Sequence, residues 1–194
     1  LIERRQKINF RFNGQQVTGF KGDTIASALM ASGHMLVGRS FKYHRPRGIM
    51  SAGVEEGGAL FNTGDGAARV PNVKGTVTEI TEGLRVYSQN VFPSPGFDLG
   101  AVNGLIAPFI TAGFYYKTFM GPFANTKFWM LCERFIRRAA GLGQASREAD
   151  PSTYDIANGF CDALVIGSGP AGLTAAAGLA EKGLNVILVE QDFE

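Results

Sequence analysis

The chain has 194 residues, of which 45% are hydrophobic and 19% charged, a composition typical of globular proteins that excludes a disordered chain. Its net charge of +2 at pH 7 argues against nucleic-acid binding driven by overall charge. The two cysteines, Cys132 and Cys161, form neither a disulfide framework nor a metal-binding spacing, so we expect a reducing, cytoplasmic setting. Because the sequence begins with Leu rather than Met, we expect it to be part of a longer protein.

The N-terminal part predicts two strands joined by a tight turn. In KINFRF, the apolar residues Ile8, Phe10 and Phe12 alternate with polar ones, which is typical of a strand with one buried face. Asn13-Gly14 follows and is a strong hairpin signal, because both residues tolerate positive φ. QQVTGF is then expected to return as the second strand.

A short helix and a second hairpin are predicted next. In GDTIASALMASG, Asp23 or Thr24 can cap the helix and Gly33 can end it. GTVTEI and LRVYS predict a hairpin over residues 76–88. This order of strands, helix and further strands predicts an α+β fold, and we assign residues 1–91 to a β-grasp domain.

The loop GRSFKYHRPRG, residues 38–48, is rich in basic side chains. These are Arg39, Lys42, Arg45 and Arg47. They could grip phosphates or an acidic partner, or form a solvated basic surface. Interleaved aromatics make single-stranded nucleic acid a minor alternative, and we predict that the chain binds none. His44 has no partner at catalytic or metal-binding spacing, which predicts a surface or packing residue.

Residues 92–150 form a connecting segment of different character. Aromatic residues, Gly and Pro are frequent over residues 92–129, which predicts either a loop packed on its own domain or a segment buried against another domain or subunit. The uncharged run Leu99–Tyr116 reaches the lower length limit of a membrane span. Its glycines, Asn103 and Pro108 would interrupt a spanning helix, so we predict no membrane segment.

TKFWMLCERFIRRAAG predicts an amphipathic helix that Thr126 can cap and Gly141 can end. Glu133 and Arg137 are placed as an i, i+4 ion pair. The expected apolar face comprises Phe128, Leu131, Cys132, Phe135, Ile136 and Ala139. The small, polar run Leu142–Ser152 is the candidate domain boundary.

Residues 151–194 are expected to begin a Rossmann-type dinucleotide-binding domain. ALVIG is a continuous apolar run, as in a strand buried on both faces of a parallel sheet. GSGPAG, a helix-forming stretch and the second buried strand NVILVE follow. A G-x-G-x-x-G between strand and helix, with an acidic residue roughly 20 positions further on, is a strong nucleotide-binding signal.

Each residue of this motif has an expected role. Gly167 permits the tight turn, Gly169 lets a pyrophosphate approach the backbone, and Gly172 lets helix and strand pack closely. Pro170 fits the first helical turn, whose amides can hold phosphates. Glu190 can accept hydrogen bonds from ribose hydroxyls and would repel a 2′-phosphate, which favours NAD or FAD over NADP. The alternative is a βαβ unit whose glycines serve packing alone.

Four stretches occur in a characteristic order: FKYHRPRGIMSAGVEEGGALF, GLRVYSQNVFPSPGFDLGAVNGLIAPFITAGFYYKTFM, IRRAAGLG and the glycine-rich motif. Together, from about Ile8 to Asp192, they resemble the α subunit of heterotetrameric sarcosine oxidase. The resemblance implies the N-terminal part of an oxidoreductase subunit acting on CH–NH donors, with β, γ and δ subunits as partners. This piece alone is expected to be inactive and to supply scaffold and cofactor binding.

The resemblance also implies chemistry and cofactors. The glycine-rich site would bind NAD, with Ala171, Glu190 and Gln191 expected to contact it, while FAD and FMN lie elsewhere in the complex. The reaction would demethylate sarcosine to glycine, with hydrogen peroxide and methylene-tetrahydrofolate as further products, and no catalytic residue falls in this chain. Related complexes that oxidise N-methylglutamate, dimethylglycine or proline, with FAD or ATP in the site, are the alternative.

In cluster-bearing relatives, the loop after PRG presents three cysteines to a [2Fe–2S] centre. The resemblance puts Ser51, Glu56 and Ala59 in these places. Because thiolates hold such clusters, we expect a ferredoxin-like domain without a cluster and without bound metal. Two rival hypotheses are an electron-transfer ferredoxin domain and a structural module that binds no nucleotide.

Overall fold

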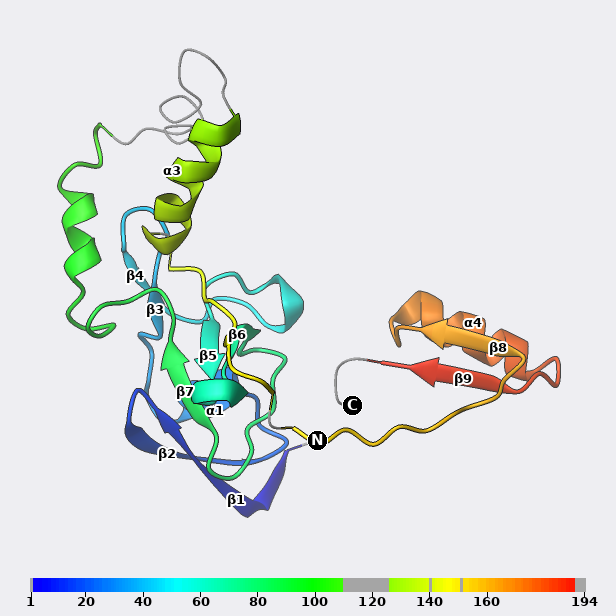
Figure 1. Cartoon of the computed structure of the whole chain (residues 1–194). Coiled ribbons are helices and arrows are strands. Elements are labelled where there is room, and N and C mark those ends of the chain that lie inside the picture. Colours follow the sequence, from blue (N-terminus) through cyan, green and yellow to red (C-terminus); the bar gives the residue numbers. More distant parts are fainter. Residues whose placement is uncertain (1, 110–125, 140, 151, 191–194) are drawn as a thin grey trace. The chain divides into compact units, whose positions relative to one another are not determined.

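The computed structural model describes residues 2–109, 126–139, 141–150 and 152–190 (Figure 1). The chain divides into two compact units, Leu1–Pro151 and Ser152–Glu194, which are described separately. Within the described ranges, no helix is both long enough and apolar enough to cross a membrane. Residues 110–116, which belong to the uncharged run Leu99–Tyr116, lie outside these ranges.

The first unit contains a five-stranded mixed sheet with the order β2-β1-β7-β5-β6 (Figure 1). Its strands are β1 (Glu3–Phe12), β2 (Gln15–Lys21), β5 (Leu60–Thr63), β6 (Val70–Lys74) and β7 (Arg85–Ser88). β1 pairs antiparallel with β2 and parallel with β7, whereas β5 pairs antiparallel with both β6 and β7. The mixed sheet confirms the predicted α+β class.

β1 and β2 form the hairpin predicted at Asn13-Gly14. The φ angles of these two residues are 48° and 85°, as a two-residue turn with both central residues at positive φ requires. The alternation of β1 places Phe10 and Phe12 in the core, where they are buried together with Val17 of β2. The local sequence therefore determines both the turn and the buried face.

Helix α1 (Ile25–Ala31) forms with the predicted cap. Thr24 Oγ1 accepts a hydrogen bond from the Ser27 N–H at 3.1 Å, and Ser27 Oγ accepts one from the Thr24 N–H at 2.9 Å. This reciprocal capping box satisfies two amides at the helix start. The hydrophobic core joins the helix to the sheet and comprises Phe10, Phe12, Val17, Ile25, Ala28, Leu29, Val37, Ala59, Phe61, Ile80 and Val86.

The predicted second hairpin is wrong. Residues 76–80 contribute only an isolated bridge between Thr24 and Glu79, and β7 pairs with β1 and β5 instead. The carbonyls of Gly75 and Thr78 accept hydrogen bonds of 2.8 Å from the first amides of α1. Because the first turn of a helix leaves its amides without intrahelical partners, this segment completes the helix start rather than a strand pair.

Shorter elements connect the sheet to the rest of the unit. They are β3 (Gly38–Arg39), β4 (Pro46–Arg47), η1 (Gly53–Glu55), η2 (Gly66–Ala68) and η3 (Leu99–Gly104). Helix α3 (Thr126–Ala139) forms as predicted, with Arg137 Nη2 2.6 Å from Glu133 Oε1. Its apolar side chains Phe128, Leu131 and Phe135 are exposed.

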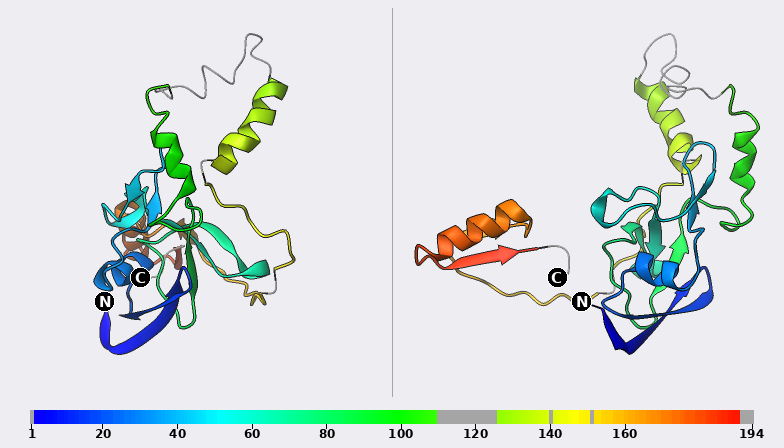
Figure 2. Two further views of the ribbon diagram at one scale, coloured as in Figure 1. Left: turned by 90° about the vertical axis from the view of Figure 1, so that its left-hand side faces the viewer. Right: turned by 180° about the vertical axis from the view of Figure 1, so that it is seen from behind.

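The second unit consists of β8 (Ala163–Ile166), α4 (Pro170–Ala180) and β9 (Val186–Val189). The two strands pair in parallel, and α4 packs against both of them (Figure 2). Leu164, Ile166 and Val189 remain exposed. The predicted βαβ unit is therefore present, while its place in a complete Rossmann-type domain stays a prediction.

Candidate functional site

The glycine-rich turn links the end of β8 to the start of α4. Gly167 has a φ of 99°, a conformation that L-residues with a side chain rarely adopt. Its N–H donates to the Val189 carbonyl at 2.8 Å, which ties the turn to the end of β9. Gly169 caps α4, and Pro170 begins the helix, where its missing N–H costs little. The turn thus brings the start of α4 to the ends of both strands.

Gly169 and Gly172 serve different needs. A Cβ on Gly172 would overlap the Gly167 carbonyl oxygen, so packing alone requires glycine there. A Cβ on Gly169 would meet no atom within 4 Å, and its φ of −62° suits any residue. Nothing in the described fold requires glycine at 169, whereas close approach of a pyrophosphate to the backbone would require it.

Glu190 follows β9 and lies at the same end of the two strands as the glycine-rich turn. Its Oε2 accepts a hydrogen bond from the Ser168 N–H at 2.5 Å. A carboxylate hydrogen-bonded to a backbone amide is a strong, charge-assisted contact. The acidic group expected to bind a ribose therefore lies directly beside the glycine-rich turn.

The structure brings most of the predicted site residues together. Gly167, Gly169, Gly172 and Glu190 surround the turn, and Pro170 and Ala171 form the exposed first turn of α4. Gln191, also predicted to contact the cofactor, lies outside the described residues. Within the described ranges, no group of three or more His, Cys, Asp and Glu side chains could hold a metal ion.

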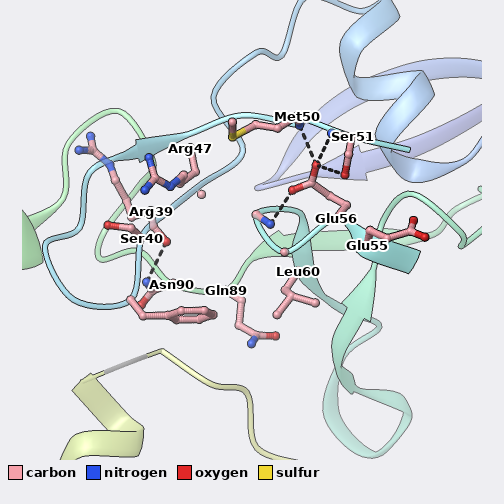
Figure 3. Close-up of a pocket in the computed structure, with 14 residues that line it drawn as sticks. Arg39, Ser40, Arg47, Met50, Ser51, Glu55, Glu56, Leu60, Gln89 and Asn90 are labelled. Carbon is pink, nitrogen blue, oxygen red and sulfur yellow. Dashed lines mark hydrogen bonds between the residues drawn. The ribbon is translucent and has the colours of Figure 1, made fainter. Parts of the chain in front are cut away.

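The positions compared with cluster ligands lie in the first unit. Glu56 is buried, and its Oε2 accepts hydrogen bonds of 2.7 Å from the N–H groups of Met50 and Ser51 (Figure 3). Its Oε1 accepts one of 2.6 Å from the Gly58 N–H. Burial acts to raise the pKa of Glu56, but these hydrogen bonds outweigh it and hold the pKa below its ordinary value. The carboxylate therefore fixes the loop from residue 50 to residue 58.

Comparison with known families matches both units. Residues 5–91 match the family described as a 2Fe-2S iron-sulfur cluster binding domain. Residues 162–194 match the family described as an FAD binding domain.

Curated relatives match nearly the whole chain. The sarcosine oxidase subunit alpha of Rhizobium meliloti (strain 1021) is 54% identical over 192 residues, which cover 98% of this chain and 19% of that protein. The chain is homologous to sarcosine oxidase α subunits. The subunit from Corynebacterium sp. (strain U-96) is 31% identical over 190 residues, which cover 98% of this chain and 15% of that protein. The chain thus spans about a fifth or less of the length of these relatives.

Among solved structures, L-proline dehydrogenase from P. horikoshii aligns with a TM-score of 0.42 and 15% sequence identity. The alignment covers 96% of this chain and 25% of that one. A likeness at this level adds nothing on fold or function.

The family matches correct the predicted cofactors. The glycine-rich segment matches FAD binding domains, and neither match involves NAD or FMN, so the prediction of NAD in this chain is wrong. The prediction of a domain without an iron–sulfur cluster is also contradicted, because residues 5–91 match a 2Fe-2S family. Motifs of this type contact an ADP moiety, which NAD and FAD share, so the motif alone could not distinguish the two cofactors.

A 2Fe-2S cluster in the matched segment would need ligands among residues 5–91. Such clusters are normally held by cysteine thiolates, but Cys132 and Cys161 are the only cysteines of the chain and both lie outside residues 5–91. Glu56 directs both carboxylate oxygens at backbone amides. Residues 5–91 therefore cannot supply thiolate ligands for such a cluster, although their sequence matches the 2Fe-2S family.

Proposed function

We propose that the chain is part of an amine-oxidising flavoprotein and that residues 162–190 hold the ADP portion of FAD. The observation that carries this proposal is Gly169, a glycine at the start of α4 that neither packing nor backbone conformation requires. The homology to sarcosine oxidase α subunits and the match to FAD binding domains support it.

The residues around the turn suit an ADP moiety. The exposed amides of the first turn of α4, at the positive end of the helix, would hold the pyrophosphate. Glu190, already hydrogen-bonded to the turn, would accept the ribose hydroxyls. Bound FAD would supply a two-electron acceptor for oxidation of the amine. The chain's own contribution is to bind and orient the adenosine end.

The whole protein is proposed to act as an α subunit, with β, γ and δ subunits as partners. Its reaction would be the oxidative demethylation of sarcosine to glycine, with hydrogen peroxide and methylene-tetrahydrofolate as further products. The name of the relatives, sarcosine oxidase subunit alpha, supports sarcosine as the substrate and the presence of further subunits. The division into residues 1–91, 92–150 and 151–194 belongs to the same proposal, with no catalytic residue in this chain.

Two alanine variants test the FAD site. A Cβ would find open space at both Gly169 and Gly178, but only Gly169 faces the proposed pyrophosphate. Calorimetric titration of the protein in its natural assembly, stripped of flavin, should give at least roughly tenfold weaker FAD binding for Gly169→Ala, since one charge-assisted contact is worth about that much. Gly178→Ala should bind FAD as the parent does. Equal FAD affinity in both variants would refute the site.

A separate experiment tests the substrate. Sarcosine, N-methylglutamate, dimethylglycine and proline are each mixed with the oxidised assembly, and bleaching of the flavin absorbance is followed. We expect sarcosine to bleach the flavin fastest. Faster bleaching by one of the other amines would overturn the substrate part of the proposal and leave the FAD site untouched.

A further inference from the structure

A cavity of about 370 Å³ lies beside the basic loop of the first unit (Figure 3). This volume falls within the usual range of small-molecule sites. Its lining includes the side chains of Phe41, Met50, Leu60 and Arg47. The lining also includes the cationic residue Arg39 and the acidic residues Glu55 and Glu56. The cavity lies in the first unit, whereas the proposed FAD site lies in the second.

Three of the four basic side chains of the loop are already engaged. The Arg39 guanidinium donates from Nε and Nη2 to the Pro95 carbonyl at 2.8 and 2.5 Å. Lys42 Nζ and Arg45 Cζ lie 5.1 and 4.9 Å from the centre of the Tyr43 ring, within cation–π range. These three side chains therefore already have partners within the first unit.

Arg47 differs from them. Its side chain is half-buried and makes neither a hydrogen bond nor an ion pair with any residue that the structure describes. Removing part of a charged side chain from water without giving it a partner costs free energy. A bound anion would remove that cost.

The carboxylates of the cavity wall do not serve as that anion. Both oxygens of Glu56 are used by backbone amides. Glu55 is exposed, and Figure 3 shows its carboxylate pointing away from the side of the cavity where Arg47 lies. Their charges still disfavour a dianion more than a monoanion, because Coulomb repulsion scales with ligand charge.

We propose that this cavity binds a small organic carboxylate, held by the guanidinium of Arg47 with its apolar body against Phe41, Met50 and Leu60. Arginine binds carboxylates through two parallel hydrogen bonds, which suits a single free guanidinium. The apolar lining favours a ligand with a hydrocarbon or aromatic body over inorganic phosphate. The proposal does not depend on the proposed FAD site.

Benzoate is a direct probe, with benzyl alcohol as the neutral control and inorganic phosphate as the competing anion. In NMR titrations of the chain, we expect saturable shifts of amides around Arg47 with benzoate and none with the other two. Arg47→Gln should weaken benzoate binding at least roughly tenfold, because it removes a charge-assisted pair. Arg45→Gln, the matched control on the same loop, should bind benzoate as the parent does.

Gly57→Leu tests the cavity without touching Arg47. Gly57 lines the cavity, and a Cβ there would meet no atom within 4 Å, so we expect a leucine side chain at this position to occupy part of the cavity. We expect this variant to lose benzoate binding while its other amide signals stay in place. Unsaturable benzoate shifts, phosphate binding as tight as benzoate binding, or unchanged benzoate affinity in either Arg47→Gln or Gly57→Leu would each overturn the proposal.

Discussion

The Nδ1 atom of His44 lies 2.7 Å from Oδ2 of Asp98, although 54 positions separate the two residues in the sequence. Their side chains are 11% and 0% exposed. The other oxygen of Asp98 accepts hydrogen bonds from the N–H groups of Phe92 at 2.9 Å and Gly100 at 3.3 Å. One buried carboxylate therefore joins the basic loop to the segment that follows β7. The sequence left open whether His44 is a surface or a packing residue, and the structure shows it buried.

Replacing Asp98 should destabilise the first unit strongly. Asp98→Ala leaves a buried imidazole and two backbone amides without their acceptor, which should lower the free energy of unfolding by about 3–5 kcal/mol. Urea denaturation measures this loss. The exposed pair of Glu133 and Arg137 provides the control, since Glu133→Gln should cost only about 0.5 kcal/mol. A loss below about 1 kcal/mol in Asp98→Ala would contradict the anchoring role.

Glu56 should make stability depend on acid pH. Hydrogen bonding holds its folded-state pKa below the ordinary value of 4.5, so on acidification the unfolded chain takes up a proton before the folded chain does. The stabilisation is therefore complete above the unfolded-state pKa and is lost as the pH falls through the folded-state pKa.

Urea midpoints measured from pH 7 downwards check this dependence. Glu56→Gln should have lower stability at pH 7 and a flatter decline with acidification than the parent. Glu55→Gln, an exposed neighbour, should keep the parent's acid slope. Identical slopes in the parent and in Glu56→Gln would speak against the role assigned to this carboxylate.

Gly172 should be irreplaceable in the second unit. In Gly172→Ala, the new methyl group would overlap the Gly167 carbonyl oxygen, which should cost about 3 kcal/mol or more. Hydrogen exchange of the β8 and β9 amides reports on this unit alone, and it should accelerate by roughly a hundredfold. Gly178→Ala, on the same helix but with open space, should leave exchange equal or slower. Equal rates in both variants would rule out the steric argument.

The capping box of α1 predicts a smaller effect. Thr24→Ala removes the acceptor of the Ser27 N–H and should lower the free energy of unfolding by about 1 kcal/mol. Thr24→Ser keeps the hydroxyl and should recover most of this loss. Chemical denaturation of both variants gives the comparison, and equal losses would show that the methyl group rather than the cap matters.

Features that depend on short stretches of sequence could be predicted. Asn13 and Gly14 specify a turn because both positive φ angles arise within the turn itself. The glycine-rich motif likewise predicts Glu190 beside the turn, because a βαβ unit brings the carboxyl ends of adjacent parallel strands together. In both places the sequence contains all the interacting groups within one supersecondary unit.

Features that depend on distant partners could not be predicted. In the segment 76–80, apolar and polar residues are interspersed as in a strand. The Thr78 carbonyl instead accepts a hydrogen bond from the start of α1, some 50 positions earlier, and no local sequence pattern indicates that partner. Asp98 and Glu56 accept hydrogen bonds from backbone amides. Any acidic residue could do so, and the sequence therefore does not indicate that these two residues have this role. NAD was predicted, with FAD only as the alternative, because a glycine-rich motif of this type does not contact the ring that distinguishes the two dinucleotides.

The central position of β7 has a consequence for biosynthesis. β7 lies between β1 and β5, so the two hairpins of the sheet cannot join until residues 85–88 have left the ribosome. At about 5–20 residues per second, the β1–β2 hairpin waits roughly 3–13 s for this strand. During that time Phe10 and Phe12 have no complete core to enter, so the nascent first hairpin exposes apolar side chains of the kind that chaperones bind.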